Sequence, residues 1–282
     1  MPDNRLLERE IEITVARALE EDLDEAGDVT SKATIAPGLP IRAEMLAKSP
    51  GVIAGLTVAQ ETFAYLDPAI EFNALVEDGT AVEAGTRIAE VSGDALAVLA
   101  GERTALNFVQ HLSGIATEVA KYTKILEGTG VELLDTRKTT PGLRHLEKYA
   151  ARVGGARNHR FGLYDQVLIK DNHISVAGDI KKAVQRARDA YPELIVEVEV
   201  ETLDEVAVAV QAGADIILLD NMDTELLKAS VKLIGNRAIT EASGGVTLAT
   251  IADIAATGVD RVSVGALTQA AKPLDISLEI IG

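Results

Sequence analysis

The sequence predicts an α/β protein in which a smaller α+β part precedes a parallel sheet whose strands alternate with helices. Three observations lead to this prediction. From residue 131 onward, short apolar runs rich in β-branched residues alternate with helical segments. Residues 41–92 instead contain apolar runs separated by turn residues. Aromatic residues make up only 3% of the chain and tryptophan is absent, so the core must consist mainly of Ala, Val, Leu and Ile, which favours regular layers.

The elements of the first part follow from spacing and turn signals. The first thirty residues have apolar side chains near helical spacing and stop at Gly27, which predicts a helix. Residues 41–92 predict strands joined by turns, because Pro and Gly punctuate the runs IRAEMLAK, GVIAGL, IEFNALV and TRIAEVSG. Two helices are predicted next, over 95–109 and 114–126.

Six strands are predicted in the second part of the chain. Their runs are VELLD, QVLIK, LIVEVEV, DIILLD, AITEA and RVSVG. Continuous apolar runs of this kind are typical of parallel strands that are buried on both faces. Their alternation with helices fits either a barrel-like or a doubly wound sheet, and we favour the barrel.

Composition and charge exclude several classes of function. The chain has no cysteine, which excludes disulfides, thiolate nucleophiles, cysteine zinc sites and iron–sulfur clusters. The net charge of −17 argues against nucleic acid or anionic lipid as a partner. No apolar run approaches the ~18 residues of a membrane span. We therefore expect a cytoplasmic protein that has no membrane contact.

Positive charge is concentrated between residues 137 and 171, where eight Lys or Arg residues stand against three acids. In an otherwise acidic protein, a cluster of one sign attracts ligands of the opposite sign. This segment therefore predicts a small anionic ligand. The alternative is a solvated helix surface.

Candidate binding residues lie at the strand ends, because ligands of parallel α/β proteins bind at the carboxyl ends of the strands. Arg137 and Lys138 could instead pair with Asp135, and Lys170 with Asp171. The side chains that would converge as donors to a carboxylate or phosphate are Arg137, Lys138, His159, Arg160 and Lys170.

Acidic side chains occur inside or directly after two of the apolar strands. Strand alternation places Glu197 and Glu199 on one face of LIVEVEV, and Asp220 closes DIILLD. Buried acids are unfavourable unless they are paired or bound to a ligand. Glu199 and Asp220 are therefore candidates for holding Mg²⁺ or sugar hydroxyls, with ion pairing to the nearby cations as the alternative.

Glycine-containing turns follow the last two strands. Ser243, Gly244 and Gly245 come after AITEA and before a predicted helix, and Gly265 follows RVSV. Backbone amides in such turns can bind phosphate, although two glycines also fit a plain tight turn. The sequence has no Walker loop, HExxH, GxSxG or dinucleotide glycine motif. It also has no close set of His and acids with the spacing of transition-metal ligands.

Eight segments, in order, carry a resemblance to a known family. They are EEDLDEAGDVTS, GERTALNFVQHLSGIAT, LLDTRKTTPGLRHLEKYA, VGGARNHRFGLYDQVLIKDNHI, VEVEVE, LLDN, EASGG and VSVGALT. Together they resemble the quinolinate phosphoribosyltransferases, also called carboxylating nicotinate-nucleotide pyrophosphorylases, over almost the whole chain. Two positions depart from the family pattern. Ala156 stands where members usually have a third glycine before NHR, and Gln269 stands where they often have histidine.

The resemblance implies both a fold and a reaction. The implied fold is an open α/β sandwich over residues 1–112, to which a tail of residues 270–282 returns, followed by an incomplete α/β barrel over 113–269. The implied reaction is the Mg²⁺-dependent transfer of the phosphoribosyl group from 5-phosphoribosyl 1-pyrophosphate to quinolinate. It yields nicotinate mononucleotide, pyrophosphate and CO₂ for NAD biosynthesis. Family members are homodimers or larger assemblies.

The resemblance also implies roles for individual residues. It assigns Arg137, Lys138, His159, Arg160 and Lys170 to the two carboxylates of quinolinate. Arg103 of GERTALN would join them from the neighbouring subunit, although its residues alone suggest only an ion pair within a helix. It assigns Ser243, Gly244, Gly245 and Gly265 to phosphate, and Glu199 and Asp220 to the ribose and Mg²⁺. The implied catalytic residues are Lys138, Lys170, Glu199 and Asp220.

Two other functions remain open at this point. The first is that of the paralogous phosphoribosyltransferase-like protein associated with molybdate transport, which shares DTRKT, although the KDNH segment argues against it. The second is a catalytically silent protein that binds pyridine carboxylates or phosphate.

Overall fold

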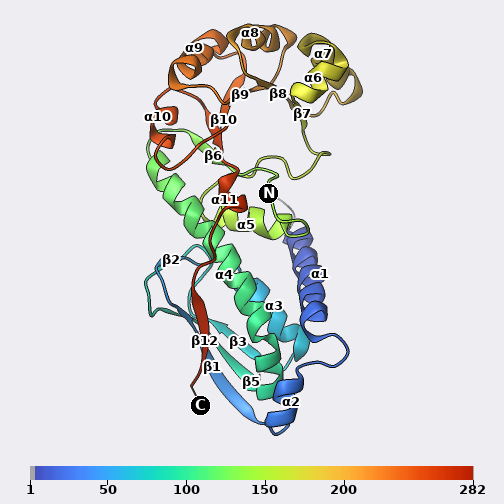
Figure 1. Ribbon diagram of the computed structural model, residues 1–282, viewed down its shortest axis with the longest axis vertical. Coiled ribbons are helices and arrows are strands. Elements are labelled where there is room, and N and C mark those ends of the chain that lie inside the picture. The colour runs from blue at the N-terminus through green and yellow to red at the C-terminus, as the bar shows by residue number, and fades with distance from the viewer. Residues whose placement is uncertain (1–3, 282) are drawn as a thin grey trace. The chain divides into compact units, whose positions relative to one another are not determined.

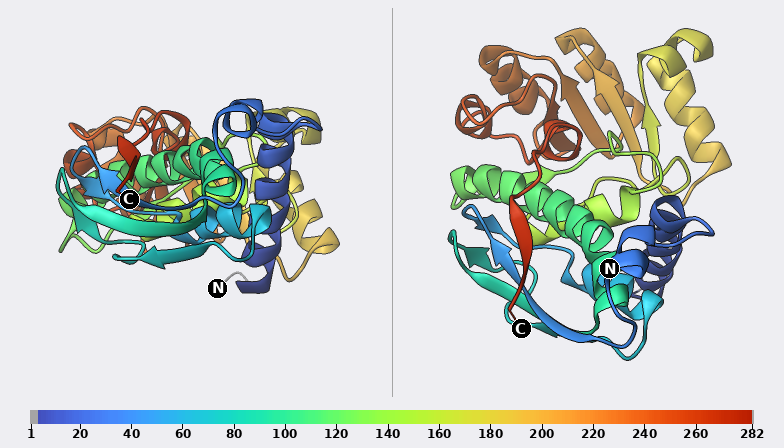
Figure 2. Two further views of the ribbon diagram at one scale, coloured as in Figure 1. Left: turned by 90° about the horizontal axis from the view of Figure 1, so that it is seen from below. Right: turned by 60° about the horizontal axis from the view of Figure 1, so that its bottom comes forward.

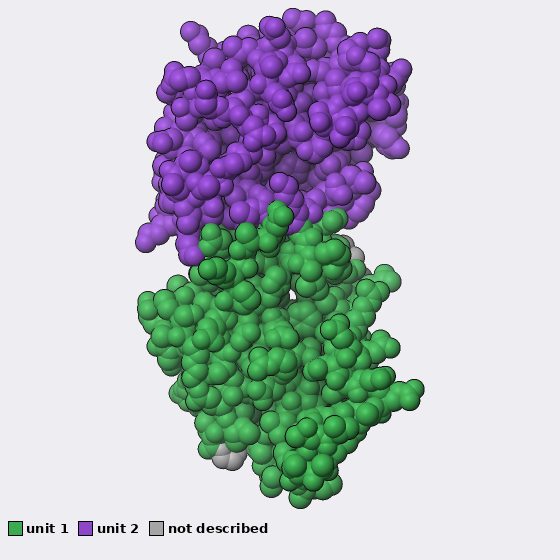
Figure 3. All heavy atoms as spheres, viewed as in Figure 1, with its two compact units in different colours: residues 1–120, 139–155, 268–282 green, residues 121–138, 156–267 purple. Residues whose placement is uncertain are grey.

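The computed structural model describes residues 4–281, which form two compact units (Figure 3). The first unit contains the chain up to residue 120, residues 139–155 and the chain from residue 268 onward; the second contains residues 121–138 and 156–267. The predicted boundary after residue 112 falls inside the helix α4 (Ala95–Leu126), through which the chain passes from the first unit into the second. No described helix is long and apolar enough to cross a membrane.

The first unit is built on a four-stranded antiparallel sheet with the spatial order β12-β1-β5-β3 (Figures 1 and 2). Its strands are β1 (Pro40–Ala47), β3 (Glu71–Ala74), β5 (Arg87–Asp94) and β12 (Ile276–Ile280). The short strands β2 (Gly51–Val52) and β4 (Ala81–Val82) form a separate pair. Besides α4, the helices are α1 (Asn4–Leu23), α2 (Val29–Thr34), α3 (Leu56–Leu66) and α5 (Arg144–Val153).

The two faces of this antiparallel sheet differ in polarity. Met45 of β1 and Val91 of β5 are buried in one apolar cluster with Phe63 of α3 and Leu106 of α4. The opposite face, which we call the outer face, carries charged side chains. They form exposed or half-buried ion pairs, Arg42–Glu90 at 3.8 Å and Arg87–Glu44 at 2.7 Å. This unit is thus a sheet with helices on one side, as expected for an open sandwich.

Two predictions for the first unit were wrong. The segments 95–109 and 114–126 form one helix, because Gly114 is present for contact rather than as a break. A Cβ at this position would lie 2.2 Å from the carbonyl oxygen of Lys272 in the C-terminal segment. Residues 56–66 form α3 rather than strands and turns. Helical spacing was visible in its buried residues, which include Val58, Ala59, Thr62 and Phe63.

The second unit contains a six-stranded parallel sheet. Its strands are β6 (Glu132–Leu134), β7 (Val167–Ile169), β8 (Val196–Val200), β9 (Ile216–Asp220), β10 (Ile239–Ser243) and β11 (Arg261–Ser263). All six predicted strands are present. The helices between them are α6 (Asp171–Ala177), α7 (Ile180–Ala190), α8 (Leu203–Ala212), α9 (Thr224–Ile234) and α10 (Ile251–Ala255), and α11 (Ala266–Gln269) follows β11.

The strand order confirms the preference for a barrel. It is β6-β11-β10-β9-β8-β7, so the five strands β7 to β11 are neighbours in sequence order and the first strand pairs with the last. A doubly wound sheet would instead reverse its order near the middle. Within the described residues, β6 and β7 do not pair with each other, which leaves the barrel incomplete.

Candidate functional site

One face of the parallel sheet carries the predicted acidic residues. Neighbouring strands place Glu199 opposite Leu218, Leu218 opposite Glu241, and Asp220 opposite Ser243. Paired residues of parallel strands present their side chains on the same face, and so do residues two positions apart. We call this the site face; its polar members on the three central strands are Glu197, Glu199, Asp220, Glu241 and Ser243.

Lys170 lies at the end of β7, directly before α6, and its ammonium group pairs with Glu199. Its backbone N–H donates to Nδ1 of His173 at 3.0 Å. The alternative considered for Glu199, an ion pair with a nearby cation, is therefore present. The partner of Lys170 in this pair is Glu199 and not Asp171, which was the partner considered for it. Within the KDNH segment, His173 thus holds the backbone of Lys170 directly after β7.

Two guanidinium groups form the most concentrated positive charge of the site. Arg160 is buried and its Nη1 donates to the carbonyl oxygen of Gln166 at 3.1 Å. Burial and then the neighbouring Arg137 lower the pKa of Arg160, which identifies two like charges near each other. The Nε of Arg137 is buried and has no hydrogen-bond partner within the described residues. Donors in this state favour an anion.

Asp135 connects the two segments that supply these arginines. It is fully buried, and its Oδ1 accepts from the backbone N–H of His159 at 2.8 Å while its Oδ2 accepts from Asn158 Nδ2 at 2.5 Å. Backbone hydrogen bonds from Arg157 to Leu133 at 2.8 Å and from Asp135 to Arg157 at 3.1 Å extend the contact beside β6. The DTRK and NHR segments are therefore held together by local hydrogen bonds.

The turn after β10 requires glycine. Gly244 has φ 92° and Gly245 has φ 62°, a region that L side chains rarely adopt. A Cβ on Gly244 would also lie 2.2 Å from Oδ1 of Asn221, whose own φ is 52° and whose Nδ2 donates to Asp220 at 2.6 Å. The predicted helix after this turn begins only at Ile251 and has five residues, so the turn does not lie at a helix start.

Lys138 and Gly265 lie in contact. The side chain of Lys138 is so close to Gly265 that a Cβ there would be 2.7 Å from the lysine Cδ. Gly265 follows β11, and its missing side chain leaves room for Lys138. This contact brings a predicted carboxylate ligand and a predicted phosphate-binding glycine to the same place.

His159 has the most unusual surroundings of the predicted residues. Its Nε2 lies 3.2 Å from Oε2 of Glu197 and 3.5 Å from Oε1 of Glu241, two fully buried carboxylates. Its Nδ1 accepts the backbone N–H of Arg160 at 2.7 Å. Burial lowers the pKa of His159, but the two glutamates outweigh it and raise the pKa to about 9. A pKa of about 9 implies that the ring carries a second proton, on Nδ1, at neutral pH. The backbone N–H of Arg160 is a donor directed at Nδ1, so it opposes that proton.

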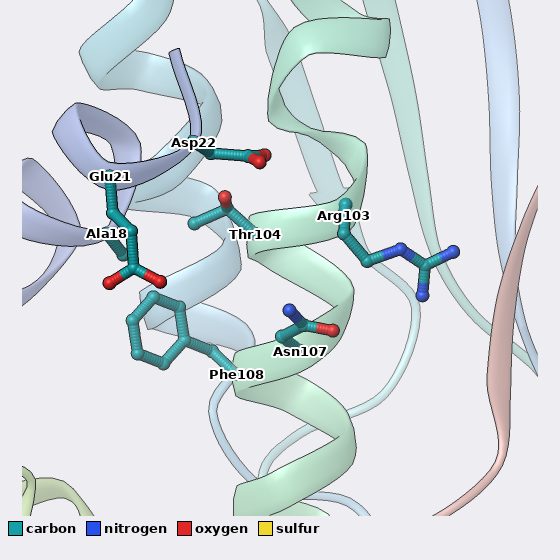
Figure 4. A pocket seen from close by; sticks show the side chains of 7 residues that line it. All are labelled: Ala18, Glu21, Asp22, Arg103, Thr104, Asn107 and Phe108. Carbon is teal, nitrogen blue, oxygen red and sulfur yellow. The ribbon is translucent and has the colours of Figure 1, made fainter. Parts of the chain in front are cut away.

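Arg103 belongs to the first unit. It is exposed on α4, where it lines a cavity with Glu21, Asp22 and Asn107. Figure 4 shows its side chain directed away from the two acids of α1. The ion pair within a helix that its residues alone suggested is not among the salt bridges of the described residues.

The two departures from the family pattern have different settings. Ala156 is buried and does not have a positive φ, whereas Gly155 before it has φ 103°. Gly154 permits close packing, because a Cβ there would lie 2.5 Å from the carbonyl oxygen of Ala116. The loop therefore uses two glycines for its geometry and tolerates alanine at the third position. Gln269 ends α11.

Sequence reasoning missed several residues that shape the site. Gln166 and Glu241 were not predicted to take part, and Glu197 was noted only for its place on the strand face. Glu241 had the same signal as Glu199, an acid in the last position but one of an apolar run. No local signal could have shown that His159 contacts both Glu197 and Glu241.

Comparison with known proteins identifies a family that matches nearly the whole chain. Residues 28–113 match the N-terminal domain of quinolinate phosphoribosyl transferase, and residues 115–279 match its C-terminal domain. Similar curated proteins include a probable carboxylating nicotinate-nucleotide pyrophosphorylase of Bacillus subtilis, which is 44% identical and covers 90% of this chain and 88% of its own. Another, from Synechocystis, is 49% identical over 85% of this chain and 83% of its own.

Solved structures give the same result. The nicotinate-nucleotide pyrophosphorylase of Francisella tularensis is 40% identical, covers 97% of this chain and 96% of its own, and superposes with a TM-score of 0.93. A structure from Streptococcus pyogenes has a TM-score of 0.92 at 41% identity, covering 96% and 97% of the two chains.

Proposed function

The chain belongs to the quinolinate phosphoribosyl transferase family, and we propose that it carries out the family reaction on the site face of its second unit. It is a pentosyltransferase that converts quinolinate to nicotinate mononucleotide in NAD biosynthesis. The relatives' names favour this reaction over the molybdate-linked paralogue and over a silent binding protein.

The buried arginine pair carries the assignment of the quinolinate side. Quinolinate has two adjacent carboxylates on a flat ring, and guanidinium groups bind carboxylates in a fork geometry. Arg160 is buried beside Arg137, whose Nε has no partner within the described residues. A dianionic ligand would satisfy this donor and neutralise both cations. Lys138 and Lys170 would complete the cationic wall.

The ribose and phosphate side would lie along β9 and β10. Glu199 and Asp220 offer carboxylate oxygens, which are the ligands that Mg²⁺ prefers, and both lie on the site face. They therefore fit the ion, which would be held partly through the substrate. Bound Mg²⁺ would neutralise the pyrophosphate as it leaves. Ser243, Gly244, Gly245 and Gly265 would hold phosphate.

The chemistry needs positioning and electrostatic stabilisation more than a protein nucleophile. Departure of pyrophosphate leaves a ribose with oxocarbenium character, which acids near the sugar ring stabilise. The pyridine nitrogen of quinolinate then attacks C1 of the ribose, the carbon that pyrophosphate has left. The resulting quaternary ring loses its 2-carboxylate as CO₂, and the electron pair left on that ring carbon, an ylide, takes up a proton to give nicotinate mononucleotide. A cationic wall would hold the carboxylate in place beforehand.

The decisive experiment follows the products. The purified protein is incubated with quinolinate, 5-phosphoribosyl 1-pyrophosphate and Mg²⁺, while CO₂ and nicotinate mononucleotide are measured, with nicotinate in place of quinolinate as the control. We expect product from quinolinate only, and none when a chelator removes the metal. Binding of quinolinate without turnover would instead support the silent binding protein, and absence of both would support the molybdate-linked paralogue.

A homodimer with shared sites is part of this proposal. The exposed position of Arg103 supports it, because an exposed arginine on a helix is available to a neighbouring subunit. Mixing two inactive chains, Arg103→Ala and Lys170→Ala, should restore part of the activity in mixed dimers, since one of the two sites would be intact. No recovery in verified mixed dimers would count against sharing. The cytoplasmic location stays a prediction.

A further inference from the structure

Glu197 and Glu241 lie on the site face beside His159, and neither glutamate has a task in the reaction described above. Both glutamates are fully buried. Oε1 of Glu197 and both carboxylate oxygens of Glu241 have no hydrogen-bond partner among the described residues. Because unsatisfied buried acceptors are unfavourable, this arrangement calls for a physical reason.

A metal site is the first interpretation to consider, since the ligand atoms of the three residues lie within 4.8 Å of one another. A metal would have to bind the lone pair of Nε2, which requires the ring hydrogen to be on Nδ1. However, Nδ1 accepts the backbone N–H of Arg160 at 2.7 Å, so Nδ1 carries the lone pair and Nε2 carries the hydrogen. The geometry therefore argues against a metal.

The same contacts leave the ring of His159 without a group to offer a ligand. Nε2 lies 3.2 Å from Oε2 of Glu197, and Nδ1 accepts the backbone N–H of Arg160. The hydrogen bond from Arg160 requires a lone pair on Nδ1, so it describes the ring with its single hydrogen on Nε2. His159 therefore differs from Arg137, whose Nε is still unpartnered among the described residues.

Glu197 is the centre of a closed set of contacts around Arg160. Its Oε2 accepts from Nε2 of Gln166 at 2.5 Å and lies next to Nε2 of His159. Gln166 in turn accepts from the guanidinium of Arg160 through its carbonyl oxygen at 3.1 Å. His159 accepts from the amide of the same arginine. Two paths thus lead from Glu197 to Arg160, one to its backbone and one to its guanidinium.

We propose that Glu197 positions Arg160, its backbone through His159 and its guanidinium through Gln166, and that His159 is a positioning residue rather than a ligand of the anion. This inference rests on the proposed function, in which Arg160 binds a quinolinate carboxylate. Glu241 lies beside the same ring, 3.5 Å from Nε2, and supplies negative charge without a hydrogen bond.

A double-mutant cycle tests this coupling. Glu197→Gln and His159→Gln are compared with the double variant, using calorimetric dissociation constants for quinolinate and for 5-phosphoribosyl 1-pyrophosphate. We expect each single change to weaken quinolinate binding about tenfold and the double change to weaken it by clearly less than about a hundredfold, because both changes remove the same contact between Glu197 and His159. Binding of the phosphoribosyl donor should stay within about twofold.

Independent effects would overturn the proposal. If the double variant loses about a hundredfold, the product of the single effects, His159 contacts the anion on its own. Melting temperatures identify variants that fail to fold. For that case Gln166→Met provides a second test, because it removes the link to Glu197 but keeps the carbonyl oxygen that holds Arg160. If Gln166→Met weakened the binding of quinolinate and of 5-phosphoribosyl 1-pyrophosphate equally, or weakened neither, the proposal would also be overturned.

Two direct observations complete the test. In a crystal structure with quinolinate bound, both ring nitrogens of His159 should keep their protein partners, and a ring nitrogen within hydrogen-bond distance of quinolinate would contradict the proposal. Stoichiometric zinc or manganese in the purified protein, lost in Glu241→Gln, would assign a metal centre instead. A wild-type chain that neither binds nor converts quinolinate would overturn the proposed function itself, before any variant is compared.

Discussion

The sheets of the two units present charged residues in very different ways. On the outer face of the first unit, Arg42 and Glu90 lie 3.8 Å apart with substantial solvent exposure. On the site face of the second unit, Glu197 and Glu241 are fully buried and three of their oxygens lack partners within the described residues. Solvated charges need no other stabilisation, whereas buried and incompletely paired charges are typical of functional sites.

The sequence patterns of these two regions are nearly the same. RIAEVSG in β5 and VEVEV in β8 both place acidic or polar side chains between apolar ones. The difference arises from the sheets, because an antiparallel sheet can leave one face in water while a parallel sheet is covered on both faces. Alternation therefore indicates which residues share a face, and the surrounding fold determines whether that face is wet.

The largest effect should come from removing a cation of the site. Arg137→Ala should weaken quinolinate binding about a hundredfold, because charge-assisted hydrogen bonds contribute about 1.5–3 kcal/mol each. Lys170→Ala should act in the same direction. Arg42→Ala on the outer face is the matched control and should leave binding unchanged. Calorimetry with each substrate checks this, and equal losses for quinolinate and 5-phosphoribosyl 1-pyrophosphate would contradict it.

The glycine turns of the two units give the second comparison. Gly85 in the first unit has φ 86° and open space around it, while Gly244 has φ 92° and faces Asn221. Gly85→Ala should therefore destabilise the fold by about 1 kcal/mol. Gly244→Ala should destabilise it by about 3 kcal/mol, since it adds a steric clash to the same backbone strain. Denaturant unfolding of both variants measures the difference, and equal losses would show that the Asn221 contact is easily relieved.

Neutralising a buried acid should change the free energy of unfolding more than neutralising a surface acid. Glu241→Gln should raise the free energy of unfolding by about 1 kcal/mol, because it removes a buried charge whose oxygens lack hydrogen-bond partners among the described residues. Glu90→Gln should change it by less than about 0.5 kcal/mol. Chemical denaturation of the two variants tests this. A marked loss of stability in Glu241→Gln would show that its attraction to His159 outweighs the unfavourable burial.

The smallest effect is expected from Arg42→Ala. Its ion pair with Glu90 is 3.8 Å long and lies in solvent, and such pairs contribute little to stability. The melting temperature should not change measurably. A clear decrease would mean that the outer face is not simply solvated surface.

Much of the fold could be predicted because its signals are local. The six apolar runs from VELLD to RVSVG each became a strand, since continuous β-branched runs specify buried parallel strands. The missed helix α3 and the split of α4 arose where Gly and Pro were interpreted as breaks. At Gly114 the glycine instead serves packing against Lys272, more than 150 positions further along the chain, which no local pattern can reveal.

The site was predictable in its members but not in their connections. Motifs brought Lys170 and Glu199 into one candidate list, and the structure joins them as an ion pair. The roles given to these residues stay predictions. The direction of the His159 ring could not be predicted, because it depends on the register of β8 against β10 through the strand between them.

The pairing of β1 with β12 has a consequence for how the chain is made. Ala47 lies opposite Ile276 and Ala43 opposite Ile280. The pairing of β1 with β12 therefore cannot form until residue 280 has left the ribosome. The parallel sheet needs nothing beyond residue 263. Contacts so distant in sequence form slowly, and until then β1 presents an open edge that can pair with another nascent chain. The unit that is synthesised first is therefore completed last.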